Sequence, residues 1–168
     1  MKTSQANRGK QLETLIDHTN RIYKQKGWGL IQKIPTPVKV ITRNNQIIKS
    51  WFDKKSTVDY IGVAHGRHIA FDAKTTKEKR LPLDMIGPHQ IDFLTHTKDQ
   101  GGIAFILAEF RQYDERYIVP IEMVSEAVKQ AGQGGRKSIP YQTIAMECDL
   151  VKSTNGVPVD YLKALKVV

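Results

Sequence analysis

Two pairs of polar side chains interrupt a stretch of otherwise apolar sequence, at a spacing that suits chemistry. One pair is Thr57 with Asp59, and the other is Asp72 with Lys74. Residues two apart in a β-strand project from the same face, so each pair points one way if both segments are strands. Between them, Ala64-His65-Gly66 is typical of a tight turn, which predicts antiparallel pairing of the two strands. The two carboxylates are then expected on one patch of the sheet.

Two carboxylates beside a lysine can serve phosphodiester hydrolysis. Carboxylate oxygens, without histidines or thiols, are the ligands that magnesium prefers. Such an ion can activate water and offset charge on a leaving oxygen. Lys74 can stabilise the charged phosphorus or help to deprotonate the water, and the Ala73 carbonyl can add a ligand. The same polar alternation occurs on any half-exposed strand. Two aspartates in apolar strands, where Asp is disfavoured, nevertheless point to function.

The composition of the chain indicates a globular domain with a polyanionic partner. The 168 residues fit a single domain, residues 1–168, and the apolar share of 40% is enough for a core. Lys and Arg number 26 against 17 Asp and Glu, a net charge of +9. That surplus favours nucleic acid, although a solvated basic surface or an anionic membrane surface would fit the charge alone.

Several classes of protein are disfavoured by what the chain contains. The single cysteine, Cys148, allows neither an internal disulfide nor a cysteine-based metal site. The N-terminal residues 1–9 are polar, which does not fit a signal peptide. No run approaches the roughly 20 apolar residues that a membrane span needs. We therefore predict a cytoplasmic protein without a membrane partner.

The periodicity of apolar residues predicts an α/β domain with a central mixed sheet flanked by helices. Helices are expected at residues 7–26, 88–99, 121–131 and 158–165, and strands at 28–34, 57–63, 67–75, 103–109 and 116–119. Residues 77–87 are expected to form a polar loop. Residues 132–137 form a flexible basic loop in which Arg136 and Lys137 can contact a DNA backbone.

The segment from Val38 to Lys55 is expected to form a hairpin or an extended arm. Two strand-like runs flank the turn-like Arg43-Asn44-Asn45-Gln46. Trp51 and Phe52 are interleaved with cations, a combination that suits base stacking and phosphate contact. An ordinary hairpin with a charged, solvated face fits equally well. The cations of the segment are Lys39, Arg43, Lys49, Lys54 and Lys55.

Blocks of residues that follow one another along the chain resemble RecU, the family of Holliday junction resolvases of Gram-positive bacteria and some of their phages. The blocks are Asn7-Arg8-Gly9 with Leu12-Glu13, Lys33-Ile34-Pro35-Thr36-Pro37-Val38, Ser56-Thr57-Val58-Asp59-Tyr60-Ile61-Gly62, Gly66-Arg67-His68-Ile69-Ala70-Phe71-Asp72-Ala73-Lys74, Pro82-Leu83, His89-Gln90-Ile91 and Gly135-Arg136-Lys137-Ser138-Ile139. No single block is decisive. Their order over residues 7–140 is specific.

The resemblance implies a restriction-endonuclease-like fold with a PD-(D/E)xK-type site, and a homodimer that nicks two opposed strands of a four-way junction. Residues 36–55 would form a projecting DNA-binding stalk. The resemblance assigns the site residues as follows: Asp59 and Asp72 as carboxylates that bind Mg²⁺ (or Mn²⁺), Thr57 and Gln90 as further ligands, Lys74 as the transition-state lysine, Glu13 facing the site, and Arg8 on DNA.

The chain departs from the family pattern in three places. Asp72 stands where family members have Glu, one methylene longer, so the metal is expected to sit slightly differently. The start close to Asn7 lacks the long basic leader of some cellular members, which would suit a phage-encoded protein. The match beyond Ile139 is weak. Two alternatives stay open: a nuclease of the same fold with a restriction or flap substrate, and a non-catalytic basic DNA-binding protein.

Overall fold

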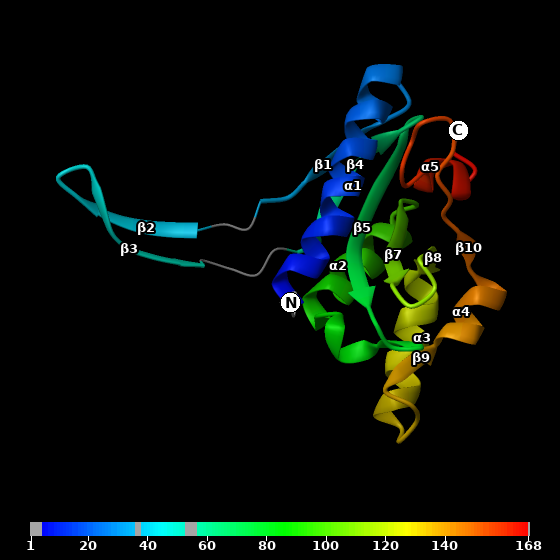
Figure 1. The fold of residues 1–168 in the computed structure, drawn as a ribbon. Coiled ribbons are helices and arrows are strands. Elements are labelled where there is room, and N and C mark those ends of the chain that lie inside the picture. Colours follow the sequence, from blue (N-terminus) through cyan, green and yellow to red (C-terminus); the bar gives the residue numbers. More distant parts are fainter. Residues whose placement is uncertain (1–4, 36–37, 53–56, 168) are drawn as a thin grey trace.

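A six-stranded sheet forms the centre of the protein in a computed structural model, which describes residues 5–35, 38–52 and 57–167, with residues 5–8, 38 and 51–52 as backbone only (Figure 1). In spatial order its strands are β1 (Leu30–Lys33), β4 (Tyr60–Ala64), β5 (Arg67–Thr76), β7 (Ile103–Phe110), β8 (Glu115–Pro120) and β10 (Asp149–Leu150). β5 and β7 run parallel, and the other neighbours run antiparallel. The predicted mixed sheet is thereby confirmed.

The two middle strands, β5 and β7, are covered on both faces. The run Ile103–Phe110 is apolar except for Glu109, as expected for a strand that is buried on both sides. The tight turn between β4 and β5 has positive φ at His65 (47°) and Gly66 (76°), so these strands pair as predicted. One prediction needs correction: β4 begins at Tyr60, so Thr57 and Asp59 precede the strand.

One face of the sheet is covered by α1 (Gln5–Lys26) and by the C-terminal segment with α5 (Tyr161–Ala164) (Figure 1). Leu12, Ile16 and Tyr23 of α1 pack on Phe71 and other buried residues of this face. Their helical spacing is the one from which the sequence predicts this helix. At the C-terminus the sequence predicts a helix over residues 158–165, whereas α5 in the structure spans only Tyr161–Ala164.

The opposite face is covered by α2 (Pro88–Asp99), α3 (Ile121–Gly132) and α4 (Tyr141–Glu147). Each contributes a buried side chain: Leu94, Val124 and Ile144 respectively. α2 lies in the crossover between the parallel strands β5 and β7, where such a connection is required. None of the described helices is long and apolar enough to cross a membrane.

Five short elements were not predicted: β6, η1, β9, α4 and β10. The expected polar loop at residues 77–87 contains β6 (Arg80–Pro82) and a 3₁₀ helix, η1 (Leu83–Met85). β6 pairs with β9 (Ser138–Pro140), directly after the basic loop 132–137. This pairing joins two segments more than 50 residues apart, and strands of three residues leave no periodicity to recognise.

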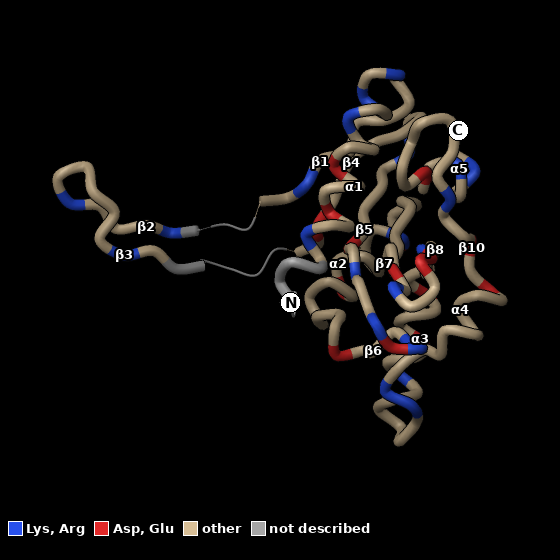
Figure 2. The backbone as a smooth tube through the Cα atoms, in the orientation of Figure 1, with Lys and Arg blue, Asp and Glu red and all other residues tan. Residues whose placement is uncertain are grey.

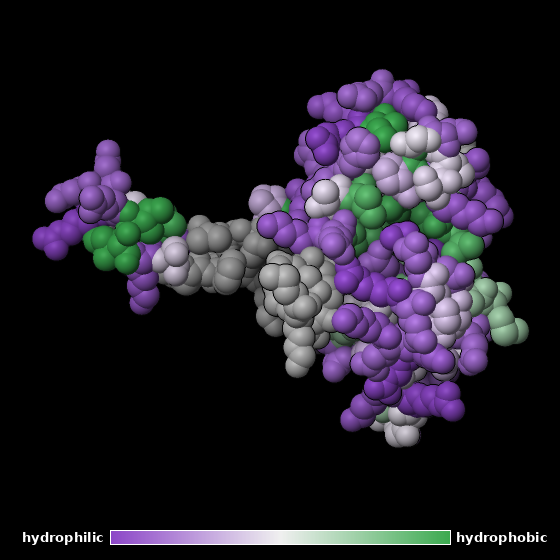
Figure 3. All heavy atoms as spheres, in the orientation of Figure 1, coloured by the Kyte–Doolittle hydropathy of each residue, from purple (hydrophilic) through white to green (hydrophobic). Residues whose placement is uncertain are grey.

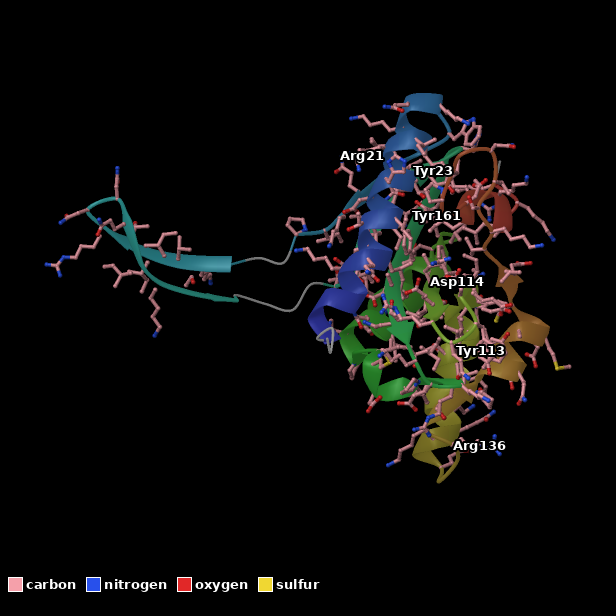
Figure 4. All side chains as sticks on the ribbon, viewed as in Figure 1. Arg21, Tyr23, Tyr113, Asp114, Arg136 and Tyr161 are labelled. Atoms are coloured by element: carbon pink, nitrogen blue, oxygen red, sulfur yellow. The ribbon has the colours of Figure 1, made fainter. Side chains whose placement is uncertain are left out.

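A polar network ties the C-terminal segment to α1. The Tyr23 hydroxyl donates to buried Asp160 (2.9 Å), and the Tyr161 hydroxyl donates to Asn20 (2.5 Å). The two tyrosine rings meet edge to face with centroids 5.1 Å apart. Figure 4 labels both residues. These hydrogen bonds satisfy polar groups that would be costly to bury unpaired.

The predicted hairpin is formed by β2 (Val38–Arg43) and β3 (Gln46–Phe52) and extends away from the sheet (Figure 1). Asn44 and Asn45 make its turn with φ of 50° and 59°, a conformation that Asn tolerates well. Between residues 38 and 52 the arm carries basic but no acidic residues (Figure 2).

The mixed sheet with helices on both faces agrees with the restriction-endonuclease-like fold that the resemblance implies.

Candidate active site

The pairing of β4 with β5 brings the two predicted carboxylates together. Tyr60 lies opposite Phe71, so Asp59, directly before β4, comes to the level of Asp72. The carboxylate of Asp59 is held by the backbone, since its Oδ2 accepts a hydrogen bond from the amide of Ala73 (3.0 Å). The half-buried Asp59 therefore has a fixed position although it lies outside a strand.

Asp72 is fully buried and contacts two of the residues singled out in the sequence. Lys74 Nζ lies 2.6 Å from Asp72 Oδ2, as expected for residues two apart on one face of β5. The side-chain amide of Gln90, on α2, donates to Asp72 Oδ1 (2.5 Å). The structure thus brings together Asp59, Asp72, Lys74 and Gln90.

The protonation of Asp72 reflects its surroundings. Burial in the sheet raises the pKa of Asp72 to about 7. The charge of Lys74 opposes this rise, and the neighbouring carboxylate of Asp59 adds to it. A buried carboxylate with a perturbed pKa beside a second carboxylate is typical of functional sites.

The site fits a hard divalent cation. Beyond the ion pair with Lys74 (2.6 Å), no described residue donates a hydrogen bond to the buried Asp72 Oδ2. A buried oxygen of this kind needs a further partner. Among the described residues, no three or more His, Cys, Asp or Glu side chains lie together in a group that could hold a metal ion. Two carboxylates with open positions suit magnesium or manganese better than zinc.

A second charged cluster lies on α1 and β1, and sequence reasoning found only one of its members. Glu13 Oε2 lies 2.6 Å from Lys33 Nζ, and the Tyr60 hydroxyl donates to Asp17 (3.0 Å). Burial lowers the pKa of Lys33, but Glu13 more than offsets it, aided by Asp17 and Asp59, so the net shift is upward. The spacing of Glu13 and Asp17, four apart on one helix, was the available signal.

A small cavity of about 410 Å³ opens beside the catalytic candidate Lys74. Lys77 and Arg111 add positive charge to its lining, and Gly9 of α1 and Thr75 of β5 also border it. The cavity therefore lies between the first helix and the end of β5. Its lining holds three basic residues and one acidic residue, Glu78, and the net positive charge suits a phosphate-bearing ligand.

The remaining predicted contacts are spread over the surface. Lys39, Arg43 and Lys49 are exposed on the hairpin, and Thr57 is exposed two residues before Asp59. Arg136 and Lys137 are exposed after α3, and Figure 4 shows Arg136 at the end of the molecule far from the hairpin. Lys54, Lys55 and the side chain of Arg8 lie outside the described residues.

Comparison with known proteins places the chain in a family. The family model of recombination protein U (RecU) matches residues 7–167. A protein of Oceanobacillus iheyensis named Holliday junction resolvase RecU is 36% identical over 95% of this chain and 85% of its own length. Relatives of the same name from Levilactobacillus brevis and Limosilactobacillus reuteri are 35% and 38% identical, over 97% and 84% of this chain and 85% and 73% of their own lengths. The phage origin stays a prediction. The chain belongs to the RecU family of recombination proteins.

Proposed function

We propose that this chain is an endonuclease that resolves four-way (Holliday) DNA junctions in recombination and repair, by magnesium-dependent paired nicking of opposed strands. The name of the relatives, Holliday junction resolvase, supports the substrate. The observation that carries the chemistry is the buried Asp72, which lies beside Asp59 and has one oxygen with no donor other than Lys74 among the described residues.

Each residue of the site has a distinct task in this proposal. Asp59 and Asp72 would hold the Mg²⁺ or Mn²⁺ ion, with Thr57 as a further candidate ligand. When bound, the ion supplies the positive charge that activates water and balances the phosphate. Lys74 would offset the extra negative charge of the phosphate in the transition state. Glu13 would act at the border of the site through its ion pair with Lys33.

The DNA contacts would come from two separated basic regions. The hairpin carries Lys39, Arg43 and Lys49 without a described acidic residue, and Arg136, followed by Lys137, lies far from it, as Figure 4 shows for Arg136. Lys54, Lys55 and Arg8 belong to the same proposal. Phosphate contacts of this kind supply most of the affinity for DNA and position the substrate.

We also propose that the chain acts as a homodimer. Two opposed phosphodiesters in a two-fold symmetric junction require two sites related by two-fold symmetry. An isolated two-stranded hairpin is only marginally stable in water. The hairpin nevertheless exposes four large apolar side chains, Val40, Ile41, Ile47 and Ile48, and Figure 3 shows a hydrophobic patch in green on the arm. A second copy would cover this surface. Acting on bacterial DNA, the dimer would work in the cytoplasm.

The test compares a labelled four-way junction with a linear duplex of equal length, with magnesium as the only variable. We expect symmetric nicks in two opposed strands of the junction and little cutting of the duplex. Equal cleavage of both DNAs would leave the assignment of the active-site residues unchanged but would contradict a preference for junctions. Binding without cleavage in Mg²⁺ and in Mn²⁺ would contradict an enzymatic role.

A further inference from the structure

Two cavities meet at Arg111, on the turn that follows β7. One is the small cavity beside Lys74, and the other, of about 1000 Å³, lies between α1 and the β7–β8 turn. Arg111 lines both cavities, and α1 borders both of them, the smaller through Gly9 and the larger through Lys10. Asp114, which Figure 4 labels, borders the larger cavity from the turn. The surface beside the candidate active site therefore continues past Arg111 along α1.

A buried carboxylate holds Arg111 in place. Glu109 lies near the end of β7 and has 5% of its surface exposed. Its Oε2 lies 3.6 Å from Nε of Arg111 and accepts a hydrogen bond from the hydroxyl of Thr75 (3.1 Å), while its Oε1 accepts one from Nε of Arg116 (3.0 Å). Nη2 of Arg111 donates to the side chain of Gln11 on α1. Arg111 is thus fixed between the sheet and α1 before any ligand binds.

The charge around Arg111 favours an anion. The larger cavity is lined by three basic and two acidic residues, and the smaller by three basic and one acidic. One of the acidic residues is the buried Glu109, whose charge two arginines offset, and another, Glu78, pairs with Arg80 (2.5 Å) outside both linings. The guanidinium of Arg111 presents its donors in a planar fork that matches a phosphate. Its side chain is 25% exposed, so a ligand can reach it.

We propose that Arg111 binds a DNA phosphate that flanks the scissile phosphate, and that Glu109 is the positioning residue for this contact. In the proposed site the scissile phosphate lies at Lys74 on one wall of the small cavity, and Arg111 forms another wall. The strand continues from there between α1 and the β7–β8 turn, where Lys10 adds a further cation. Because Arg111 is held in advance, little conformational freedom of this side chain is lost when DNA binds. This inference rests on the proposed function, since it describes how that site holds its DNA.

The affinity for DNA tests the Arg111 contact without an ion and without cleavage. Binding of a labelled four-way junction is measured in a chelator over a range of salt concentrations. We expect Arg111→Gln to bind about 10-fold more weakly and to reduce the slope of log affinity against log salt concentration by about 1. Arg67→Gln is the matched control, because Arg67 is exposed at the opposite end of β5 from Lys74, and it should bind within about 2-fold of the wild type. Wild-type affinity and slope for Arg111→Gln would overturn the proposal.

Chemical neutralisation of single phosphates locates the contact. Phosphates around the branch point of the junction are replaced in turn by neutral methylphosphonates, and binding is measured for the wild type and for Arg111→Gln. We expect a replacement beside the nicked bond to weaken wild-type binding about 10-fold and to have little further effect on Arg111→Gln, since both changes remove the same contact. Losses that add at every position would overturn the proposal.

The positioning role of Glu109 is tested by Glu109→Gln. Removal of a negative charge by itself tightens binding to DNA, whereas loss of a positioning residue weakens it. We expect weaker junction binding by Glu109→Gln, below its thermal unfolding transition, and no further loss when this change is combined with Arg111→Gln. Tighter binding by the folded variant would overturn the positioning role. Arg111→Gln decides the phosphate contact even where Glu109→Gln does not fold.

Failure of this inference is distinguishable from failure of the proposed function. A wild type that binds the junction but does not cleave it in Mg²⁺ contradicts the nuclease, while the coupling between Arg111 and a phosphate is still measured by binding. Cleavage by the wild type, without coupling of Arg111 to any phosphate, overturns the phosphate contact alone.

Discussion

At the scale of single residues, Asp72 is the most unusual group in the structure. It is fully buried in an apolar sheet, and one of its oxygens has no donor other than Lys74 among the described residues. The sequence predicted its pairing with Lys74 from spacing alone, because a strand places residues two apart on one face. The burial of Asp72 and its contact with Gln90 depend on how α2 packs on the sheet, and the local sequence pattern does not predict this packing.

The raised pKa of Asp72 predicts that the metal-free protein loses stability as the pH rises. In the folded chain the Asp72 carboxyl keeps its proton up to about pH 7, whereas in the unfolded chain it loses the proton near its ordinary pKa of 3.8. The stability contribution of this carboxyl is therefore complete below pH 4 and is lost as the pH rises through 7. Between pH 5 and pH 8 the free energy of unfolding is expected to fall by an amount on the order of 3 kcal/mol.

Urea unfolding at pH 5 and pH 8 in a chelator measures this dependence. Asp72→Asn, which cannot ionise, should show a flatter pH profile than the wild type, and excess Mg²⁺ should restore the wild type at pH 8. Parallel profiles for the two proteins would show that Asp72 keeps an ordinary pKa.

At the scale of elements, the parts predicted correctly are those with strong local signals. Pro88 and the Gly101-Gly102 pair gave bounds for α2 that the structure confirms, and the apolar run at β7 was recognised as a strand. β6 and β9 were missed because each has three residues and gains its stability from the other. The charged cluster of Glu13 and Lys33 likewise needs the packing of α1 on β1.

The pairing of β1 with β4 depends on a close backbone approach at Gly62. A Cβ at this position would lie 2.1 Å from Leu30 O and 2.5 Å from Ile31 Cα, both backbone atoms of β1. Gly62→Ala should therefore push β1 away and destabilise the fold by about 2–3 kcal/mol. Gly9→Ala is the control, because a Cβ on this helical glycine meets nothing within 4 Å. It should stabilise by about 0.5–1 kcal/mol. Denaturant unfolding distinguishes the two, and equal effects would contradict the close approach.

The hairpin is expected to select the branched substrate. Replacing residues 39–52 with a short Gly–Ser linker removes Lys39, Arg43 and Lys49 but leaves Asp59, Asp72 and Lys74 in place. Junction binding and cleavage should fall at least 10-fold, while linear-duplex binding should change less, because the basic loop near Arg136 remains. Gel-shift assays on both DNAs measure the difference. An equal loss on both would favour a nuclease that does not discriminate junctions.

At the scale of the whole molecule, assembly is the property that the sequence of one chain reveals least. The ordered blocks predicted the family correctly, but no local pattern encodes a symmetry axis. The exposed apolar residues of the hairpin are the structural reason to expect a second copy. Sedimentation should give twice the mass of the chain.

Charge on that surface should separate the two copies. Ile47→Asp together with Ile48→Asp is expected to weaken the dimer at least 10-fold, because charged groups would be buried without partners. Met146→Asp is the matched control, since Met146 is an exposed apolar residue (85%) on α4. A hairpin variant that sediments like the wild type would place the dimer interface elsewhere.

The central claim is that Asp72 belongs to a metal-dependent nuclease site, and Asp72→Asn tests it most directly. Binding of a labelled four-way junction is measured in Ca²⁺, and cleavage of the same junction in Mg²⁺, for the wild type and the variant. We predict that Asp72→Asn binds the junction within a few-fold of the wild type, because phosphate contacts dominate affinity, and cleaves it at least 1,000-fold more slowly, roughly 4 kcal/mol of barrier. Cleavage by Asp72→Asn at the wild-type rate would contradict the account.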